Sequence, residues 1–301
     1  MYDLITFGDI TIDLFFKGKS LTREKDRFHL AVGGKYQADS FFESLGGGGA
    51  NVAAGVANFG FKTAVFGQVG NNPFKHMILQ KLLSKHVAQE FLIEKENYLN
   101  ISSILLTEDG EKTVVHYVSP NDHLIVQEKY ENKLTQTKMV YMGNMPDMTL
   151  REKIRILTFF KKNNIDICLN IGINDCRLPL NDTLPLIKLA DIFVINTHEY
   201  AELVKKDIQK IDFKKDWAKY LSIEKQTLVV TDGTHGSYCS NNGKAYFQGV
   251  IEKGKRVDAT GAGDAYVSGF ISAYLEEASI ENAMIKGSEY SGIKITHIGA
   301  E

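Results

Sequence analysis

The sequence has little cysteine, and the few cysteines that it has exclude two kinds of protein. Among 301 residues the only cysteines are Cys168, Cys176 and Cys239. Their spacing matches no metal-binding motif, and their odd number argues against the disulfide framework of a secreted domain. Because such a chain suits a reducing compartment, we expect a cytoplasmic protein.

The sequence also lacks an excess of charge of one sign and any long hydrophobic run. Its 35 Lys and Arg residues face 37 Asp and Glu residues, which gives a formal net charge of -2. No overall basic field attracts a nucleic acid backbone, so we expect no nucleic acid partner and only local anion binding. The first residues lead directly into the apolar segment 4–7 without a basic leader or cleavage site. We therefore expect neither export nor a membrane span.

The chain does have enough apolar residues for a large core, since 44% of them are hydrophobic. This composition suits one large α/β domain or two smaller ones. Short apolar segments alternate with segments of helical spacing, which is typical of a parallel sheet covered by helices on both faces. The expected strands are 4–7, 64–69, 139–142, 165–169, 192–195 and 228–231. The expected helices are 51–59, 73–86, 150–163, 197–205 and 262–275. In such a fold, ligands bind beyond the carboxyl ends of the strands.

Two segments, 11–45 and 100–121, break this alternation. Asp109 and Gly110 form a good hairpin turn between the extended segments 102–107 and 113–118. Both segments are therefore expected to form a small sheet outside the main domain. The residues alone leave open whether this sheet covers a site or is a surface decoration.

The most informative stretch lies near the C-terminus, where Gly261, Ala262 and Gly263 precede Asp264 and an apolar helical segment. Small residues before a helix let backbone N–H groups converge on an anion such as phosphate. Asp264 is placed to accept the proton of an attacking hydroxyl, as carboxylates do in phosphoryl transfer. The alternative is that Asp264 is a simple N-cap of the helix.

A second run of small residues, Gly46 to Gly49, precedes the helix expected at 51–59. Four consecutive glycines cost backbone entropy on folding, so they indicate that something approaches the main chain closely. A flexible linker is the competing interpretation, but the helix follows immediately.

Both stretches carry a family resemblance. Residues 258–266 resemble the C-terminal signature of the ribokinase-like carbohydrate kinases, the PfkB family, and residues 46–53 resemble its N-terminal glycine signature. The similarity continues through Gly8, Asp9, Asp13 and the stretches 196–199, 231–236 and 291–300. It implies a ribokinase-like, doubly wound α/β fold whose mainly parallel sheet is sandwiched by helices. The main domain would comprise residues 1–10, 46–99 and 122–301, and a small β lid would comprise residues 11–45 and 100–121.

The resemblance also implies an activity, the ATP-dependent phosphorylation of a sugar hydroxymethyl group with Mg²⁺ and an optional K⁺. Asp264 would be the catalytic base, and the anion hole would consist of Gly261, Ala262 and Gly263. The acceptor would be held by Asp9, Asp13, Gly46, Gly47 and Asn51. The nucleotide would be bound by Asn196, Thr231, Gly233, Gly236 and Thr260. Glu199 would organise magnesium through water, and Asp258 and Thr260 would bind a monovalent cation.

The residues assigned to the nucleotide and to magnesium at the start of helix 197–205 have an alternative interpretation. Asn196 and Glu199 also have the spacing of a helix capping box. Asn144, which follows the strand expected at 139–142, is a further candidate for the acceptor pocket because of that position.

The acceptor itself is less well defined. Ribokinases and sugar-phosphate kinases of the family usually carry a lysine where this chain has Gly48. Its absence removes one cation that could pair with a substrate phosphate, so an unphosphorylated sugar is favoured. Lys112 and His116 in the second lid segment nevertheless leave an acidic sugar open. A nucleoside is the alternative acceptor, because aromatic side chains crowd the first lid segment and can stack on a base, although they suit a lid core or a dimer interface equally. These are Phe15, Phe16, Phe28, Tyr36, Phe41 and Phe42.

Two further expectations concern the whole chain. A lid sheet this small is marginal alone, so we expect a homodimer through the lid. A non-catalytic binding protein that kept the fold is the least favoured function, since Asp264 and the glycines are all present.

Overall fold

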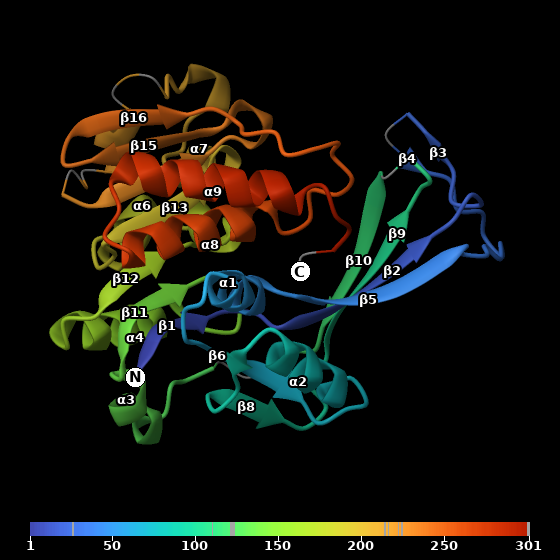
Figure 1. Ribbon diagram of the computed structural model, residues 1–301, viewed down its shortest axis with the longest axis horizontal. Helices are drawn as coiled ribbons and strands as arrows, with labels where there is room; N and C mark the ends of the chain where they lie inside the picture. Colours follow the sequence, from blue (N-terminus) through green and yellow to red (C-terminus); the bar gives the residue numbers. More distant parts are fainter. Residues whose placement is uncertain are drawn as a thin grey trace.

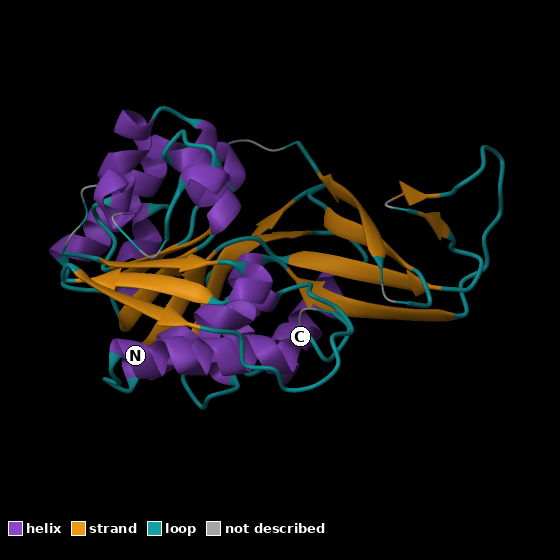
Figure 2. Ribbon diagram, turned by 90° about the horizontal axis from the view of Figure 1, so that it is seen from above, coloured by secondary structure: helices purple, strands orange, loops and turns teal. Residues whose placement is uncertain are grey.

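The computed structural model describes residues 1–25, 27–109, 111–120, 124–213, 215, 217–221, 223 and 225–299. Its centre is a ten-stranded, mainly parallel sheet with helices on both faces (Figure 1). A second, smaller sheet projects from one end of this body (Figure 2). The expected α/β architecture is therefore confirmed.

The strands of the large sheet lie in the order β16-β15-β14-β13-β12-β11-β1-β6-β7, and β8 also pairs with β6. Pairing is parallel from β7 to β14 and antiparallel in β14, β15 and β16. All six expected strands are present, within a few residues of their predicted ends. The bounds are β1 Tyr2–Phe7, β6 Thr63–Gly70, β7 Val87–Ala88, β8 Leu92–Lys95, β11 Thr137–Met142, β12 Asp166–Leu169, β13 Ile192–Asn196, β14 Thr227–Thr231, β15 Ser237–Asn241 and β16 Lys244–Gln248.

The helices include all five that were expected and several that were not. Their bounds are α1 Gly48–Ala57, α2 Lys75–Ser84, α3 Glu128–Leu134, α4 Leu150–Lys162, α5 Ile173–Arg177, α6 Leu180–Ile187, α7 Thr197–Leu203, α8 Ala262–Leu275 and α9 Ile280–Lys294, with short 3₁₀ turns at Ile208–Lys210, Trp217–Leu221 and Gly233–His235. Within the described ranges, no helix has the length and apolar character needed to cross a membrane.

Two helix starts differ from the prediction. Helix α1 begins at Gly48 instead of residue 51, because the last two glycines of the run form its first turn. Helix α2 begins at Lys75, and Pro73 lies in the turn before it. Helix α9, which packs beside α8 (Figure 1), was not anticipated as a helix.

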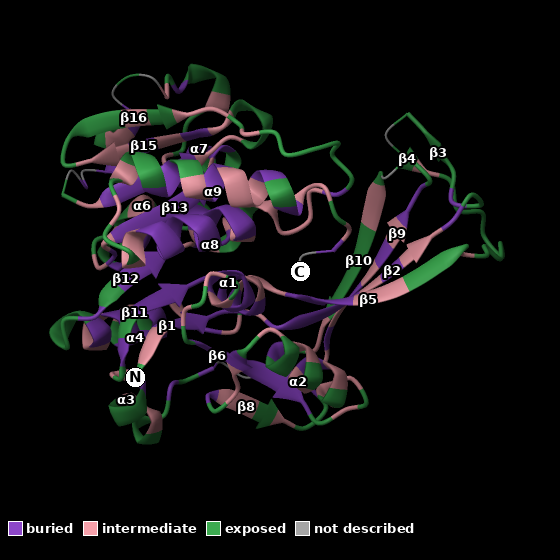
Figure 3. Cartoon of the chain, in the orientation of Figure 1, coloured by how far each residue is buried: buried purple, intermediate pink, exposed green. Residues whose placement is uncertain are grey.

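The core explains why the central strands are continuous apolar runs. Strands β1, β6 and β11 are buried on both faces, because helices cover each side of the sheet (Figure 3). On the face covered by α4, Phe7 stacks on Phe66 at a centroid distance of 4.7 Å, and Phe160 meets Phe7 edge-on at 5.5 Å. The other face is covered by α1, α8 and α9.

The smaller sheet, here called the lid sheet, has the strand order β10-β9-β2-β5. Its strands come from the two segments that broke the alternation: β2 Thr11–Lys17, β5 Ser40–Gly46, β9 Asn100–Leu106 and β10 Lys112–Val118. A two-stranded ribbon of β3 Arg23–Glu24 and β4 Arg27–Phe28 lies at its far end (Figure 1). The predicted hairpin between β9 and β10 is present, although Gly110 of its turn lies outside the described residues.

Candidate active site

Two neighbouring cavities open where the carboxyl ends of the central strands meet α8. One of them brings together Asn196, Glu199, Thr231, Gly263 and Asp264, with side chains from the ends of β11 to β13 completing its wall. The other lies between the loop after β14, the start of α8 and the face of α9. Because Thr231 and Gly263 line both, a long ligand in the second cavity would reach Asp264 in the first.

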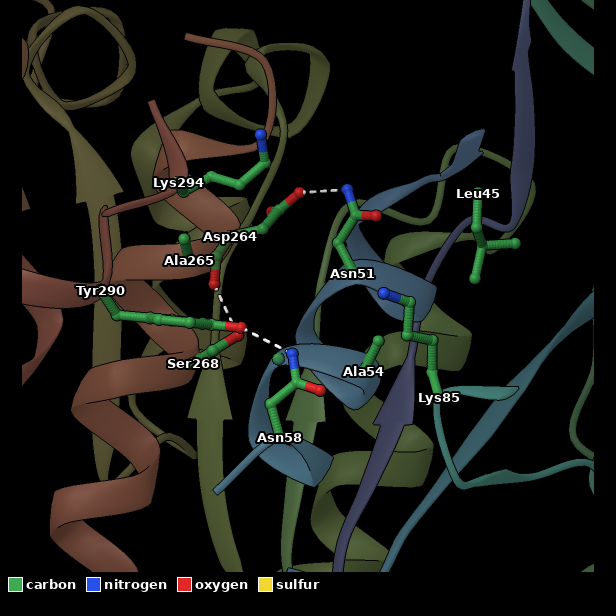
Figure 4. A pocket seen from close by; sticks show the side chains of 11 residues that line it. Leu45, Asn51, Ala54, Asn58, Lys85, Asp264, Ala265, Ser268, Tyr290 and Lys294 are labelled. Carbon is green, nitrogen blue, oxygen red and sulfur yellow. Dashed lines mark hydrogen bonds between the residues drawn. The ribbon is translucent and has the colours of Figure 1, made fainter. Parts of the chain in front are cut away.

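Asp264 is held by Asn51, which comes from the other glycine signature 213 residues away. The Nδ2 atom of Asn51 donates a hydrogen bond of 2.7 Å to Oδ2 of Asp264, and Figure 4 shows the two side chains pointing toward one another from α1 and α8. The interpretation of Asp264 as an N-cap is wrong, since Gly261 is the N-cap and no side chain caps this helix.

The electrostatics of Asp264 suit a proton acceptor. Desolvation by burial raises the pKa of this carboxyl above its usual value, and the hydrogen bond from Asn51 opposes that rise only in part. A carboxylate whose pKa is raised takes a proton more readily than one in water.

The loop before α8 has the backbone expected of an anion-binding turn. Gly261 is left-handed with a φ of 73°, a conformation that glycine adopts without strain. It turns the chain so that α8 starts at Ala262, beside the two cavities. The first N–H groups of a helix lack intrahelical acceptors and carry partial positive charge. A phosphate at Gly261, Ala262 and Gly263 would therefore be stabilised by the main chain.

The glycine run before α1 is required by close packing, as predicted. A Cβ atom on Gly49 would lie 2.7 Å from the main chain of Gly8, and one on Gly47 would lie 2.3 Å from the carbonyl oxygen of Asp9. A Cβ atom on Gly46 would lie 2.3 Å from Oδ2 of Asp13. The run therefore brings α1 against the end of β1, where Asp9 is located, and places Gly46 against Asp13 of β2.

Asp9 lies in a negatively charged environment after β1. Desolvation by burial raises its pKa to about 7, with a further contribution from the carboxylate of Asp147 and a smaller opposing one from Lys153. The same two carboxylates contribute, after desolvation, to a raised pKa of the buried Tyr98. Asp147 and Tyr98 were not identified from the sequence, and no motif marked them.

Asp13 is a buried residue of β2, which is a strand of the lid sheet. Desolvation raises its pKa, while a hydrogen bond from Ser102 and the charges of His116 and Lys112 lower it. The register of the lid sheet explains this grouping, because Asp13 pairs with Ser102, and Ser102 pairs with His116. His116 Nδ1 lies 3.2 Å from the Ser102 hydroxyl.

Asn144 follows β11, at the same end of the sheet as the other candidates. It is exposed, and the loop after β12 passes close to it. A Cβ atom on Gly172 would lie 2.3 Å from its Oδ1 atom.

Asn196 and Glu199 form a capping box at the start of α7. Asn196 Oδ1 accepts from the Glu199 N–H at 2.8 Å, and Glu199 Oε2 accepts from the Asn196 N–H at 3.3 Å. Both also line the cavity that contains Asp264. Desolvation by burial raises the pKa of Glu199 despite these bonds. The structural role is therefore present, and the magnesium role stays a prediction.

The second cavity gathers the other nucleotide candidates, Thr231, Gly233 and Gly236, at the end of β14. Gly233 and Gly236 both have positive φ, at 52° and 108°. Among the described residues lining this cavity, Arg256 carries a charge. Arg256 was missed because an isolated arginine in a basic stretch gives no motif.

Asp258 and Thr260 bind the ammonium group of Lys112, a contact that the sequence did not predict. Lys112 of the lid sheet donates a hydrogen bond of 2.9 Å to Asp258 Oδ1 and a second, short one to Thr260 Oγ1. In the structure Lys112 pairs with this carboxylate, whereas the sequence leaves open that it contacts an acidic sugar. The stretch 291–300 lies beside the same loop, with Gly299 donating to Asp258, but Ala300 lies outside the described residues.

Comparison with protein families agrees with this geometry. The family model described as pfkB family carbohydrate kinase matches residues 1–301. A curated relative from Thermoanaerobacterium thermosaccharolyticum, an ATP-dependent 6-phosphofructokinase, is 24% identical and aligns over 99% of this chain and 92% of its own length. A probable fructokinase-5 from Arabidopsis thaliana is 26% identical over 92% of this chain and 84% of its own.

Solved structures show the same fold. A ribokinase from Arabidopsis thaliana complexed with ribose and ATP superposes with a TM-score of 0.81 at 20% identity, covering 99% of this chain and 94% of that one. An adenosine kinase from Sinorhizobium meliloti superposes with a TM-score of 0.79 at 21% identity, covering 100% and 95%. At these identities, the two superpositions show a shared fold.

Proposed function

The chain belongs to the pfkB family of carbohydrate kinases, phosphotransferases that act on alcohol groups, and from that premise we propose that it transfers the γ-phosphoryl group of ATP to a hydroxymethyl group of an unphosphorylated sugar. One observation carries the proposal. The Asn51–Asp264 hydrogen bond of 2.7 Å joins the two glycine signatures beside the point where the two cavities meet. The carboxylate of Asp264 therefore lies in the first turn of α8, the helix whose N-terminus would bind a phosphate.

The nucleotide would occupy the cavity between β14 and α9, with its phosphates directed past Thr231 and Gly263 toward Asp264. The main chain at 261–263 would bind the γ-phosphate, and Arg256 would neutralise charge on the phosphates. The ribokinase that superposes on this chain was solved with ATP, which supports this direction.

A magnesium ion fits the oxygen-rich wall formed by Asn196, Glu199, Thr231 and Asp264. The described residues include no group of three or more His, Cys, Asp or Glu side chains that could hold a metal by themselves. Glu199 would therefore act through water, as suits a small cation that dehydrates reluctantly. When bound with the nucleotide, magnesium neutralises charge on the phosphate oxygens.

The chemical step assigns one proton acceptor. The acceptor hydroxyl oxygen forms a bond to the γ-phosphorus while the bond from that phosphorus to the bridging oxygen breaks, and ADP leaves with the electron pair. Asp264 takes the hydroxyl proton. Asn51 fixes the orientation of the carboxylate, so catalysis is mainly positioning and electrostatic stabilisation.

The acceptor site favours a neutral polyol. Asp9, Asp13, Asp147 and Asn144 offer hydrogen-bond acceptors at the end of the sheet, which suit the hydroxyl groups of a sugar. After burial, the negative charge of Asp147 contributes to the raised pKa of Asp9, so two acidic groups act on each other here. A phosphate on the acceptor would meet further repulsion there, so we place less weight on a sugar phosphate than the name of the 6-phosphofructokinase relative alone suggests.

A nucleoside is the second candidate, supported by the likeness of the fold to an adenosine kinase. The aromatic side chains of the lid, which the sequence offered as a stacking surface for a base, support a nucleoside only weakly. Phe15 and Phe42 stack at 4.8 Å in a small core with Ile104, Leu106 and Ile298, so these rings are occupied by the lid itself.

We further propose that the lid sheet closes over the acceptor and excludes water, which would otherwise compete for the phosphoryl group. In this proposal the lid comprises residues 11–45 and 100–121, and the main domain comprises residues 1–10, 46–99 and 122–301. The outer face of the lid would join two chains in a homodimer. The three free, buried cysteines suit the reducing cytoplasm, where we expect the enzyme to work.

The test is ADP release with ATP and magnesium across free sugars, sugar acids, sugar phosphates and nucleosides. We expect turnover with a free sugar and a fall of about 10³-fold or more in kcat for Asp264→Asn, with acceptor and ATP binding retained. Near-normal turnover of this variant would refute the role of Asp264. Turnover only with a nucleoside or a sugar phosphate would refute the proposed acceptor.

A further inference from the structure

Lys112, the first residue of β10, crosses from the lid sheet to the loop that precedes the anion-binding turn. Its ammonium donates to Asp258 Oδ1 at 2.9 Å and to the hydroxyl of Thr260. These are the two residues that the family resemblance assigned to a monovalent cation. The Lys112 side chain is partly buried and that of Asp258 almost completely so, at 30% and 1% exposed.

The described contacts of Asp258 leave little of its carboxylate for a further cation. Oδ1 accepts three hydrogen bonds, from Lys112, from the Thr260 N–H at 2.9 Å and from the Thr260 hydroxyl at 2.7 Å. Oδ2 accepts from the N–H of Gly299 at 3.1 Å. Burial opposes the charge of this carboxyl, but the bonds from Lys112 and Thr260 outweigh that effect and hold its pKa below the usual value. Asp258 is therefore an ionised group that is already paired.

A second ammonium lies in the same region. Lys294, at the end of α9, is 7% exposed, and its Nζ atom has no hydrogen-bond partner among the described residues. It is attracted by Asp258 and repelled by Lys112, while burial lowers its pKa. Figure 4 shows its side chain beside Asp264. Two lysines around one carboxylate would repel any additional cation, so a resident potassium ion does not fit these residues.

We propose that the ammonium of Lys112 takes the place of the monovalent cation, so that this enzyme braces its anion-binding loop with its own lysine and works without potassium. An alkylammonium supplies one positive charge and three donors to the same two oxygen ligands, Asp258 and Thr260. Because these residues lead directly into Gly261, the lysine holds the loop from which the phosphate is bound.

The position of Lys112 has a second consequence. Since it belongs to the lid sheet, the brace links the lid to the nucleotide side of the site. A soluble cation would brace the loop regardless of the lid, whereas Lys112 braces it only when β10 lies against it. Lys112 is in this sense a positioning residue, and its role rests on the proposed kinase function.

The experiment compares KCl with choline chloride at equal ionic strength. Lys112→Met removes the charge and keeps the length of the side chain. Because Lys294 could move onto Asp258 in that variant, Lys112→Met/Lys294→Met is made as well. Lys19→Met is the matched control, since Lys19 is a lid lysine in an exposed ion pair with Glu108 at 3.8 Å. Turnover, the Kd for ADP with magnesium and the melting temperature are measured for each protein.

For the unmodified protein and Lys19→Met we expect potassium to change turnover and Kd by less than about twofold. For Lys112→Met, and more strongly for the double variant, we expect losses in choline that potassium restores by about tenfold or more, together with a potassium-specific rise in melting temperature. The inference is overturned if the unmodified protein itself requires potassium, or if neither variant responds to it. Failure to find any acceptor would refute the kinase function but not the expected potassium-dependent melting and ADP binding.

Discussion

At the scale of single residues, burial determines what the acidic side chains can do. Desolvation raises the pKa values of Asp9, Asp13 and Asp264, whereas Asp258, with its lysine and threonine donors, stays below its usual value. Asp264 and Asp13 accept hydrogen bonds from the uncharged side chains of Asn51 and Ser102, whereas Asp258 forms an ion pair with Lys112. We propose that the first three carboxyl groups are the ones that meet the acceptor hydroxyls.

Asp9 gives a prediction that separates function from stability. Its pKa of about 7 in the folded protein lies well above that of an unfolded aspartate, so its contribution to stability is present at low pH and is lost as the pH rises through 7. Asp9→Asn should therefore raise the free energy of unfolding at pH 8 by roughly 1–3 kcal/mol and leave it little changed near pH 4. Urea denaturation at the two pH values measures this.

The same carboxylate should make acceptor binding depend on pH. As the pH falls from 8 to 6, protonation of Asp9 removes a hydrogen-bond acceptor, so KM for the sugar should rise several-fold while KM for ATP stays constant. Asp147→Asn removes a repelling charge and should move the midpoint to lower pH. A KM for the sugar that does not change with pH, or an Asp9→Asn protein less stable at pH 8, would contradict this account.

The sequence identified most residues of the candidate site but not their partners. Asn51 and Asp264 were found because each lies in a glycine-rich signature, and their hydrogen bond follows from the packing of α1 on α8. Asp147, Tyr98 and Arg256 carry no local signal. Their roles depend on which strand ends and loops meet in space, which a single sequence does not encode locally.

At the scale of elements, the alternation of apolar and amphipathic segments predicted the central strands and the five main helices. The strands buried on both faces were the clearest, because they are continuous apolar runs. The glycine run was harder. Its last two residues were expected to precede α1 and instead form its first turn, since glycine has a low helix propensity and tertiary packing overrides it here.

Adjacent glycines in that first turn should behave differently. A Cβ atom on Gly49 would lie 2.7 Å from the main chain of Gly8, whereas one on Gly48 would come no closer than 3.6 Å to its nearest neighbour, Oδ1 of Asp264. Gly49→Ala should therefore destabilise the protein by about 2 kcal/mol or more, because main chain cannot move aside easily. Gly48→Ala is the matched control.

We expect Gly48→Ala to melt within a few degrees of the parent protein and to lose part of its kcat, because its new methyl group contacts the carboxylate of Asp264, the proposed catalytic base. Thermal melting followed by circular dichroism measures the first effect, and steady-state kinetics measures the second. Equal stability of the two variants would show that α1 can shift away from β1, which would contradict the close packing inferred here.

At the scale of the whole molecule, the lid sheet has two unlike faces. On the inner face Phe15, Ile104 and Leu106 are buried. On the outer face, Phe16 and Phe41 are directly paired across β2 and β5, and their rings contact each other. The large sheet is covered on both faces, whereas on this lid face α2 covers the end nearest the main body, where Ile12 and Leu45 pack with Ile78 and Leu82.

This outer face is the basis for predicting a homodimer. Phe41 on β5 and Val115 and Tyr117 on β10 are 55%, 65% and 51% exposed, so large apolar side chains reach water on both edge strands of this face. A two-fold pairing of such faces would bury them and stabilise a four-stranded sheet that has a small core of its own. Size-exclusion chromatography with light scattering should give twice the chain mass of 33.7 kDa.

A charge on that face should separate the two chains. Val115→Lys places an ammonium among apolar groups that the dimer would bury, so we expect a monomer by light scattering with its melting temperature lowered. Phe247→Lys is the matched control, since Phe247 is 58% exposed on β16, at the far edge of the large sheet, and should leave the dimer intact. If the parent protein is a monomer, the outer lid face is not a dimer interface, and the lid sheet is stable through its contacts with its own chain alone.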